Sequence, residues 1–444
     1  MALLRVKTTA GRVEGRFRAE MVAPGLPVRP SLPDVARYYL DRTPDQQKTQ
    51  FLEAVAQATA EGRPVRVGTA CSGTDSPVAV FTALAASLPG LQIEHTFSCE
   101  YHKGKREWIR DNFPRLPALF GDIGELGTGR AFDYITGQAR PVPAVDIFVT
   151  GFVCKSISSQ NNSRGQFANC IREASGLTGV TFQGTLNYVK AFRPAIVILE
   201  NVNGLTKKAR GKGPVIAHIR ELFASTGYAF EHKVLDTRRY LLPHRRQRCW
   251  MWAFRGQENQ YAAELAGTTI VKLGQARFWK MASLFRQVHA RPDSRKAKQV
   301  LTSRQRRVLA LVKQHKAKHK GLVVDVGQGE DRGGSFCSGG AAPCLLPNSK
   351  LYHADRKQVL GVEQVLALQG IFRKDFPALP AWAAARRTLA RDMAGNAFST
   401  TTCMAVVLAA LIHGPLLCTA CVPRIADESS SDGSPVVKRA RREE

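Results

Sequence analysis

Asp146-Ile-Phe-Val-Thr-Gly-Phe-Val-Cys154 is the most informative part of this sequence. Residues 145–150 are mostly apolar and rich in β-branched side chains, which predicts a buried strand, and Cys154 follows just past its carboxyl end. In an open α/β sheet, ligands and catalytic groups collect at the carboxyl ends of the strands. Cys154 is therefore a candidate catalytic thiol, although a lone buried cysteine is more often inert packing.

Two further predicted strands bring charged side chains to the same edge. Residues 195–199 form an aliphatic run that ends in Glu200, and residues 249–254 follow Arg246 and Arg248. A thiol, a carboxylate and two arginines at neighbouring strand ends could form one site for covalent catalysis.

The alternation of strands and helices predicts the fold class. Strand candidates alternate with helical stretches from residue 65 to residue 254, which favours an α/β fold with a mixed, mostly parallel, doubly wound sheet of the Rossmann-like kind. The strand candidates are 65–70, 93–100, 118–123, 145–151, 195–201, 233–236 and 249–254.

Composition shifts divide the chain into five segments. Residues 1–60 are interpreted as an N-terminal arm and helix, 61–255 as the catalytic domain and 256–350 as a smaller basic target-recognition domain. Residues 351–420 are expected to return to the catalytic domain, and 421–444 to form a disordered tail. Between Arg295 and Lys320 there are ten Lys and Arg residues and no acid. A basic helix with an apolar side is expected there, with the apolar residues Val308, Leu309, Leu311 and Val312.

The overall charge points to a polyanionic partner. The chain of 444 residues carries 64 Lys and Arg against 36 Asp and Glu, a net charge of +28, which points to a polyanion, most simply nucleic acid. The alternative is a generally basic proteome. No apolar run of 18 residues exists, so no transmembrane helix is expected. The scattered cysteines favour a reducing compartment and predict no metal site, since only Cys418 and Cys421 have CxxC spacing.

Seven short motifs then follow one another: Cys71-Ser-Gly-Thr-Asp-Ser-Pro77, Glu100-Tyr101, Gly121-Asp-Ile123, Gly151-Phe-Val-Cys-Lys155, Glu200-Asn-Val202, His244-Arg-Arg-Gln-Arg248 and Gly395-Asn-Ala-Phe398. In this order they resemble the motifs of the C5-cytosine methyltransferases, which use S-adenosyl-L-methionine (AdoMet) to methylate cytosine in DNA. The resemblance spans roughly residues 65–254 and 356–410. It implies a class I methyltransferase fold.

The resemblance also implies a cofactor site for AdoMet. Glu100 would accept the ribose hydroxyls, Tyr101 would pack on adenine and Asp122 would accept from the adenine amine. The late motif would complete the pocket beside the first strand. The full set of predicted cofactor-binding residues is Cys71, Gly73, Thr74, Glu100, Tyr101, Asp122, Ile123, Asn396 and Ala397.

Cytosine chemistry assigns a role to each predicted catalytic residue. A thiolate that adds to C6 makes C5 nucleophilic, which is the role of Cys154. Glu200 would protonate or hydrogen-bond N3, and Arg248, with Arg246 second, would stabilise charge at O2. No residue declares itself as the base that removes the C5 proton, and a water is one option. The target cytosine of double-stranded DNA must be flipped out of the stack.

Further residues are expected to contact DNA. Ser158 matches a family position that touches phosphate, and residues 155–175 are interpreted as a lid over the flipped base. The predicted DNA-binding residues are Ser158, Arg164, Arg304, Arg306, Arg307 and Lys313. In the tail, Lys438, Arg439, Arg441 and Arg442 predict nuclear import, with a solvated charged tail as the alternative. The sequence names no protein partner.

Three departures from the family pattern keep other functions open. Asp75 and Ser76 stand where the family has Gly, Val153 replaces Pro and Lys155 replaces Gln. These changes permit a catalytically silent regulator that binds AdoMet or DNA. An RNA cytosine methyltransferase of the same fold is a second alternative, although the Cys-Phe-Thr run of that branch is absent. A chromatin-packing basic protein would explain the charge but not the strand-end chemistry.

Overall fold

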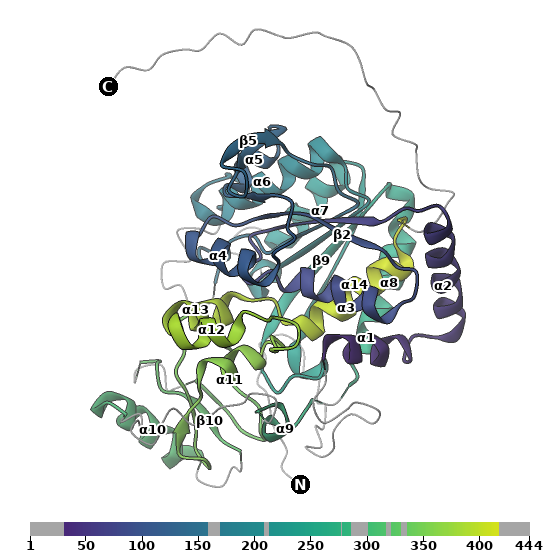
Figure 1. The fold of residues 1–444 in the computed structure, drawn as a ribbon. Helices are drawn as coiled ribbons and strands as arrows, with labels where there is room; N and C mark the ends of the chain where they lie inside the picture. The colour runs from purple at the N-terminus through teal and green to yellow at the C-terminus, as the bar shows by residue number, and fades with distance from the viewer. Residues whose placement is uncertain are drawn as a thin grey trace, which may run out of the picture.

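The computed structural model describes residues 31–158, 169–207, 213–276, 278–285, 301–316, 321–329 and 335–416. Within these ranges a nine-stranded sheet forms the centre of the molecule, in the order β5-β4-β3-β2-β1-β6-β7-β9-β8 (Figure 1). Its strands are β1 (Val65–Ala70), β2 (Ile93–Cys99), β3 (Leu119–Phe120), β4 (Arg130–Asp133), β5 (Gln138–Pro141), β6 (Ile147–Thr150), β7 (Ile196–Val202), β8 (Tyr228–Asp236) and β9 (Gln247–Arg255).

The central strands are parallel and the outer ones antiparallel. β1 pairs in parallel with β2 on one side and with β6 on the other, and β6 pairs in parallel with β7. At the two edges, β3–β4, β4–β5, β7–β9 and β8–β9 are antiparallel. The mixed, mostly parallel α/β sheet predicted from the sequence is confirmed.

Helices cover both faces of the sheet because the central strands are apolar on both sides. Ile147 and Val149 join the core under α3 (Ser76–Ser87), α8 (Gln260–Leu273) and α14 (Thr400–His413), whereas Phe148 between them joins the opposite core. That second core packs against α5 (Ile123–Leu126), α6 (Gly176–Phe192) and α7 (Val215–Ser225). This double burial is what a continuous aliphatic run in a parallel sheet indicates.

The strand order places the functional loops together. From β1 the chain proceeds to β2 and β3 in one direction, and later continues from β6 to β7 in the other. The order therefore reverses between β1 and β6, and the crevice at such a point is where α/β proteins bind ligands. The loop after β1 contains Gly73 and the loop after β6 contains Cys154.

The sequence prediction missed the hairpin β4–β5 at the edge of the sheet. Residues 118–123 were expected to form one strand, but β3 covers only Leu119–Phe120 because Asp122 caps α5. The chain then forms the hairpin β4–β5, which extends the sheet at its edge. Each of its strands has only four residues, which is too short for an alternation of apolar and polar residues to stand out in the sequence.

The C-terminal segment packs back onto the sheet through α11 (Val362–Ala367), α12 (Leu379–Ala385), α13 (Arg387–Asn396) and α14. α14 is buried between α3 and α8, as Figure 1 shows in yellow. No single helix in the described ranges is long and apolar enough to cross a membrane; α13 and α14 pass that test only as a bent pair.

A second, smaller sheet holds the basic module. β10 (Val323–Asp325) pairs with β11 (Ser335–Cys337) and with β12 (Leu351–His353), which pairs with β13 (Gln358–Val359). The basic helix α10 (Ser303–Lys316) packs on it through Val308, Leu309 and Val312. Leu311, expected on the same apolar side, is 36% exposed.

The predicted domain boundaries at 255/256 and 350/351 remain predictions. Two observations bear on where they fall. α8, which begins at Gln260, packs against β8 and α14 of the large unit. β12 and β13, beyond residue 350, pair within the small sheet. α9 (Met281–Phe285) lies between these elements in sequence and adds Leu284 to the large core.

Two helices, rather than the single one expected, precede the sheet. α1 (Leu32–Leu40) packs against α3 and α14, and α2 (Asp45–Ala60) packs against α14. At the start of α1, the Leu32 N–H donates to the Asp375 carboxylate at 3.3 Å from one oxygen and 3.4 Å from the other. Burial, opposed by that hydrogen bond and assisted by the Asp34 charge, raises the pKa of Asp375 to about 7.

This raised pKa predicts a pH-dependent stability. A carboxyl group whose pKa is higher in the folded than in the unfolded chain stabilises the fold at low pH, and that contribution is lost as the pH rises through 7. We expect Asp375→Asn, which keeps the acceptor oxygen, to be more stable than the wild type at pH 8 by up to about 4 kcal/mol and by less than half of that at pH 5, because the difference vanishes only below the unfolded-state pKa of about 4. Urea unfolding at the two pH values measures it. Asp41→Asn, at an exposed carboxylate, is the control and should change neither value.

Candidate active site

The loop after β1 has an unusual backbone. Cys71, Gly73 and Asp75 all have positive φ, at 51°, 64° and 57°. Only Gly adopts this conformation without cost, and Asp tolerates it better than most residues. At Gly73 a Cβ would point into open space, so the backbone there is accessible to a ligand.

A buried hydrogen-bond network accounts for Asp75, one of the departures from the family pattern. The Asp75 side chain is completely buried under the loop. Its Oδ1 accepts hydrogen bonds from Thr69 Oγ1 and Ser72 Oγ, each at 2.6 Å, and its Oδ2 accepts from Ser98 Oγ. These three hydrogen bonds hold Asp75 in the positive-φ conformation that a Gly would adopt more easily, so the loop makes the same turn without a Gly at this position.

Two carboxylates lie at the next strand ends. Glu100, just after β2, is buried; its Oε2 accepts from the Gly73 N–H at 3.1 Å and its Oε1 from the His102 N–H at 3.0 Å. Tyr101 beside it is 81% exposed. Asp122 is exposed at the start of α5 and uses Oδ1 to accept from the Gly124 N–H at 2.8 Å.

The loop that carries Cys154 is fixed from two sides. The Val153 N–H donates to Thr181 Oγ1 of α6 at 3.1 Å, so this position has an N–H that the Pro of the family pattern could not supply. Asn201 Nδ2 of β7 donates to the Phe152 carbonyl at 2.8 Å. The thiol is thereby held at a defined place beyond β6, next to the end of β7.

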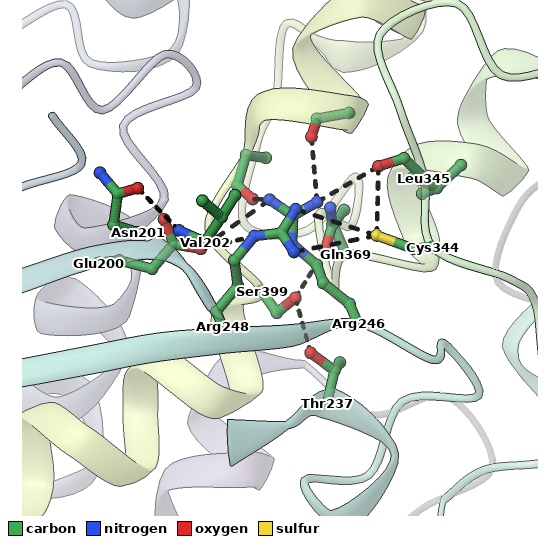
Figure 2. Close-up of polar contacts among 12 residues, drawn as sticks. Glu200, Asn201, Val202, Thr237, Arg246, Arg248, Cys344, Leu345, Gln369 and Ser399 are labelled. Carbon is green, nitrogen blue, oxygen red and sulfur yellow. Dashed lines mark hydrogen bonds and ion pairs between the residues drawn. The ribbon is translucent and has the colours of Figure 1, made fainter. Parts of the chain in front are cut away.

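Glu200 and the two arginines form a buried ionic cluster at that place. Arg248 Nε lies 3.2 Å from Glu200 Oε1, and Arg246 Nη2 lies 3.9 Å from the same oxygen. The exposed fractions of the three side chains are 12% for Glu200, 14% for Arg248 and 3% for Arg246. β7 and β9 are antiparallel neighbours, with Val202 paired to Arg248, so the sheet itself brings these groups together (Figure 2).

Burial shifts the pKa values of Cys154, Glu200 and Arg246 towards their neutral forms. Burial raises the pKa of the Cys154 thiol; Arg248 and Arg246 oppose that shift, and Glu200 adds to it. Burial likewise raises the pKa of Glu200 against the same two arginines. Burial, with the neighbouring charge of Arg248, lowers the pKa of Arg246 to about 10, which leaves it protonated at neutral pH. A carboxyl group with a raised pKa is suited to donate a proton.

The two arginines differ in what they bind. Arg246 donates from Nη1 to the carbonyls of Leu345 and Gly395, at 3.4 and 3.0 Å, and from Nη2 to that of Ala397 at 3.0 Å. Its contacts are thus mostly to the backbone of later segments. Arg248 faces Glu200 and the Cys344 sulfur, as Figure 2 shows. Of the two, Arg248 is the one placed to reach a ligand in the site.

The other predicted residues are distributed as follows. Thr74, Ile123 and Ala397 are buried within the fold near the loops that contain them. Asn396 is exposed, and its Nδ2 donates to the carbonyl and Oδ2 of Asp392, at 3.1 and 3.2 Å. The described basic side chains on α10, which are Arg304, Arg306, Arg307 and Lys313, are all exposed. Arg164 and the tail residues 438–442 lie outside the described residues.

The sequence prediction missed Cys344, which lies beside the ionic cluster of Glu200 and the two arginines. Its sulfur accepts from both Nη1 and Nη2 of Arg248 at 3.9 Å. Cys344 belongs to an irregular segment before β12, without the strand or helix periodicity that would have marked it. Its position is fixed instead by a hydrogen bond at 3.0 Å between the Leu345 N–H and the buried His244 Nε2.

The model of the C-5 cytosine-specific DNA methylase family matches residues 79–330, more than half of the chain, so this chain belongs to that family. Members of the family use AdoMet as methyl donor. A DNA (cytosine-5-)-methyltransferase, DMT5, of Cryptococcus neoformans is 35% identical over 223 residues, which is 49% of this chain and 8% of that protein. The family resemblance predicted from the sequence is confirmed.

Two bacterial relatives match the same kind of domain. The type II methyltransferase M.HaeII of Haemophilus aegyptius is 29% identical over 36% of this chain and 43% of its own length. M.HhaI of Haemophilus parahaemolyticus is 25% identical over 40% of this chain and 50% of its own length. The chain thus spans half or less of the length of these relatives. A solved DNA modification methyltransferase from an Escherichia coli prophage is 14% identical over 78% of this chain and 98% of its own, with a TM-score of 0.47. The fold assignment rests on the strand order.

Proposed function

We propose that this chain transfers a methyl group from AdoMet to C5 of cytosine in double-stranded DNA, through a covalent bond between Cys154 and C6 of a flipped base. One observation carries the proposal. Within the described residues, the buried Glu200 Oε1 has no hydrogen-bond partner with suitable geometry, although Arg248 lies within ion-pair distance. An unsatisfied buried carboxyl oxygen is costly. It would accept from the cytosine amine when deprotonated and donate to the ring nitrogen N3 when protonated.

The chemistry follows from the three groups. The Cys154 thiolate forms a bond to C6, and the C5–C6 π electrons move towards C5 and, through C4, to N3. Glu200 gives its proton to N3, while Arg248 stabilises charge at O2. C5 takes the methyl group of AdoMet, with S-adenosyl-L-homocysteine as the leaving group, and N3 returns its proton to Glu200. A base then removes the C5 proton, and the electrons of that C–H bond restore the C5–C6 double bond as the thiolate leaves. The identity of the base stays open, with water as one option.

The residues after β1, β2 and β3 fit AdoMet. Gly73 leaves open space where a side chain would stand, Tyr101 exposes its ring, and Asp122 has one oxygen beyond its contact with Gly124. Glu100 would hold the ribose, Tyr101 and Asp122 the adenine, and Gly73 the methionine part. When bound there, AdoMet supplies an electrophilic methyl group. The chain's own residues orient it and exclude water from the crevice between β1 and β6.

The basic module would supply the contacts to DNA. Arg304, Arg306, Arg307 and Lys313 present exposed charge on one helix whose apolar side is buried in the small sheet, which leaves the charged side for phosphates. Ser158, at the end of the Cys154 loop, is proposed to touch the backbone near the flipped base. The basic tail at residues 438–442 supports nuclear localisation.

A methyl-transfer assay tests the function. The full chain is incubated with tritiated AdoMet and with double-stranded DNA of mixed sequence, single-stranded DNA or RNA. We expect label in 5-methylcytosine of the double-stranded DNA. Label in RNA alone would favour the RNA methyltransferase instead. Binding of AdoMet and DNA without any methyl transfer would favour the silent regulator, the alternative that the changes at Val153 and Lys155 permit.

The cofactor assignment makes a separate prediction. Glu100→Ala removes a carboxylate that can accept both ribose hydroxyls, in a charge-assisted contact of about 1.5–3 kcal/mol. We expect the Kd for AdoMet to rise at least about tenfold by calorimetry. Glu221→Gln, at an exposed carboxylate on α7, is the control and should leave the Kd unchanged. An unchanged Kd in the Glu100 variant would contradict the placement of the ribose.

A further inference from the structure

The guanidinium of Arg106 and the ring of Tyr134 link the ends of β2 and β3, the two strand ends that would hold the adenosine. Arg106 lies on α4 (Lys103–Asn112) and is only 9% exposed. Its Nη1 donates to the carbonyl of Glu100 at 3.0 Å and to the carbonyl of Tyr101. On its other side, its guanidinium carbon lies 3.7 Å from the centre of the Tyr134 ring, well within the range of a cation–π contact.

The Tyr134 ring in turn supports the other strand end. Tyr134 follows β4, in the hairpin that the sequence prediction missed. Its ring lies against Gly121, where a Cβ would come within 2.8 Å of it. Gly121 directly precedes Asp122. The ring therefore lies between the arginine that binds Glu100 and Tyr101 and the strand end that carries Asp122.

The hairpin is anchored and does not depend on Tyr134 for its position. Asp133, the preceding residue, is completely buried and accepts from the Leu119 N–H of β3 at 2.8 Å and from Thr136 Oγ1 at 2.9 Å. Burial raises the pKa of Asp133, but these hydrogen bonds outweigh that effect and lower it on balance, so the carboxylate stays charged. Arg140 Nη1 lies 3.5 Å from it.

We propose that Arg106 and Tyr134 are a positioning pair for the cofactor, which fixes the separation and orientation of Glu100 and Asp122. This inference rests on the proposed function. Glu100 and Asp122 would contact the ribose and the adenine amine of one rigid adenosine at the same time. Their geometry must therefore be set before binding, because ordering them during binding would weaken affinity. Neither Arg106 nor Tyr134 needs to touch the cofactor for this role.

Calorimetry with AdoMet on the full chain tests the pair. Tyr134→Leu removes the ring at a partly exposed position, and we expect it to raise the Kd about five- to tenfold. Tyr134→Phe keeps the ring and should restore affinity to within about twofold of the wild type. Arg106→Lys keeps the charge but loses the planar group that stacks on the Tyr134 ring while it donates to the carbonyls of Glu100 and Tyr101. This variant should raise the Kd at least as much as Tyr134→Leu. In the double variant that combines Tyr134→Leu with Arg106→Lys, the Kd should rise by less than the product of the two single increases, because both changes break the same contact.

Three further readouts separate positioning from general damage. Thermal unfolding reports folding, DNA affinity should stay at the wild-type value, and the kinetic loss should fall on KM for AdoMet rather than on kcat. Tyr261→Leu, which removes a tyrosine that is 71% exposed on α8, is the matched control. If the wild type binds AdoMet and Tyr134→Leu binds it equally well, the positioning pair is wrong while the proposed function stands. If the wild type does not bind AdoMet, the proposed function itself fails.

Discussion

DNA that contains 5-fluorocytosine should become covalently linked to this protein when AdoMet is present, and Cys154→Ser should abolish the link. Fluorine replaces the C5 proton, so after methyl transfer no proton can be removed and the bond from sulfur to C6 cannot be broken. The adduct should survive denaturation and accumulate with one protein per DNA. On ordinary DNA, Cys154→Ser should lower the rate of methyl transfer by at least about 10⁴-fold, because the hydroxyl is a far weaker nucleophile.

Peptide mapping should place the adduct on Cys154. Cys71 and Cys344 also lie near the proposed pocket, so a link on either would move the nucleophile and overturn the assignment. Cys337→Ser, at a buried thiol in the small sheet, is the matched control and should leave the adduct intact. Binding of both AdoMet and DNA without any adduct would contradict the covalent mechanism.

The second large effect is expected at Glu200. Glu200→Gln preserves the shape of the side chain but cannot give a proton to N3, so kcat should fall by about 10²- to 10³-fold. Because burial raises the pKa of Glu200, the wild type should lose activity as the pH rises past that value, and the Gln variant should lack this limb of the profile. Steady-state kinetics from about pH 5.5 to about pH 9 measure both, a range that spans a raised carboxyl pKa.

Glu221→Gln again provides the control, since that carboxylate is exposed on α7 and remote from the cluster. DNA affinity should be retained in the Glu200 variant, because the phosphate contacts that we propose lie on α10. A Gln variant with wild-type kcat would show that ring protonation does not involve Glu200.

The sequence predicted the parallel core well because its signals are local. In β6, Ile147, Phe148 and Val149 are buried on alternating faces, and an unbroken apolar run of that length is typical of a strand that is covered on both sides. Cys154 and Glu200 meet because they stand at or near the carboxyl ends of the neighbouring strands β6 and β7. Arg248 joins them because β9 runs antiparallel to β7, which places the start of β9 at the same edge.

What the sequence could not predict depends on distant contacts. Cys344 reaches Arg248 across 96 residues of chain, through an irregular segment that no periodicity marks. Leu311 was expected to be buried with Val308 and Val312, but it lies on the exposed side of α10 because the small sheet covers a narrower stripe of the helix. The role of Tyr134 depends on a close approach to Gly121 that only the assembled sheet reveals.

The clamp around Arg246 also bears on the order in which the protein is made. Arg246 leaves the ribosome well before the carbonyls of Leu345, Gly395 and Ala397 that bind it, and α14, which fills the face of the sheet behind β1 and β6, is synthesised later still. A nascent chain that has just completed β9 therefore carries Cys154, Glu200 and both arginines without the contacts that hold Arg246 in place. The buried cluster can take its described form only once residues 345–397 have been made, and α14 follows directly to cover that face of the sheet.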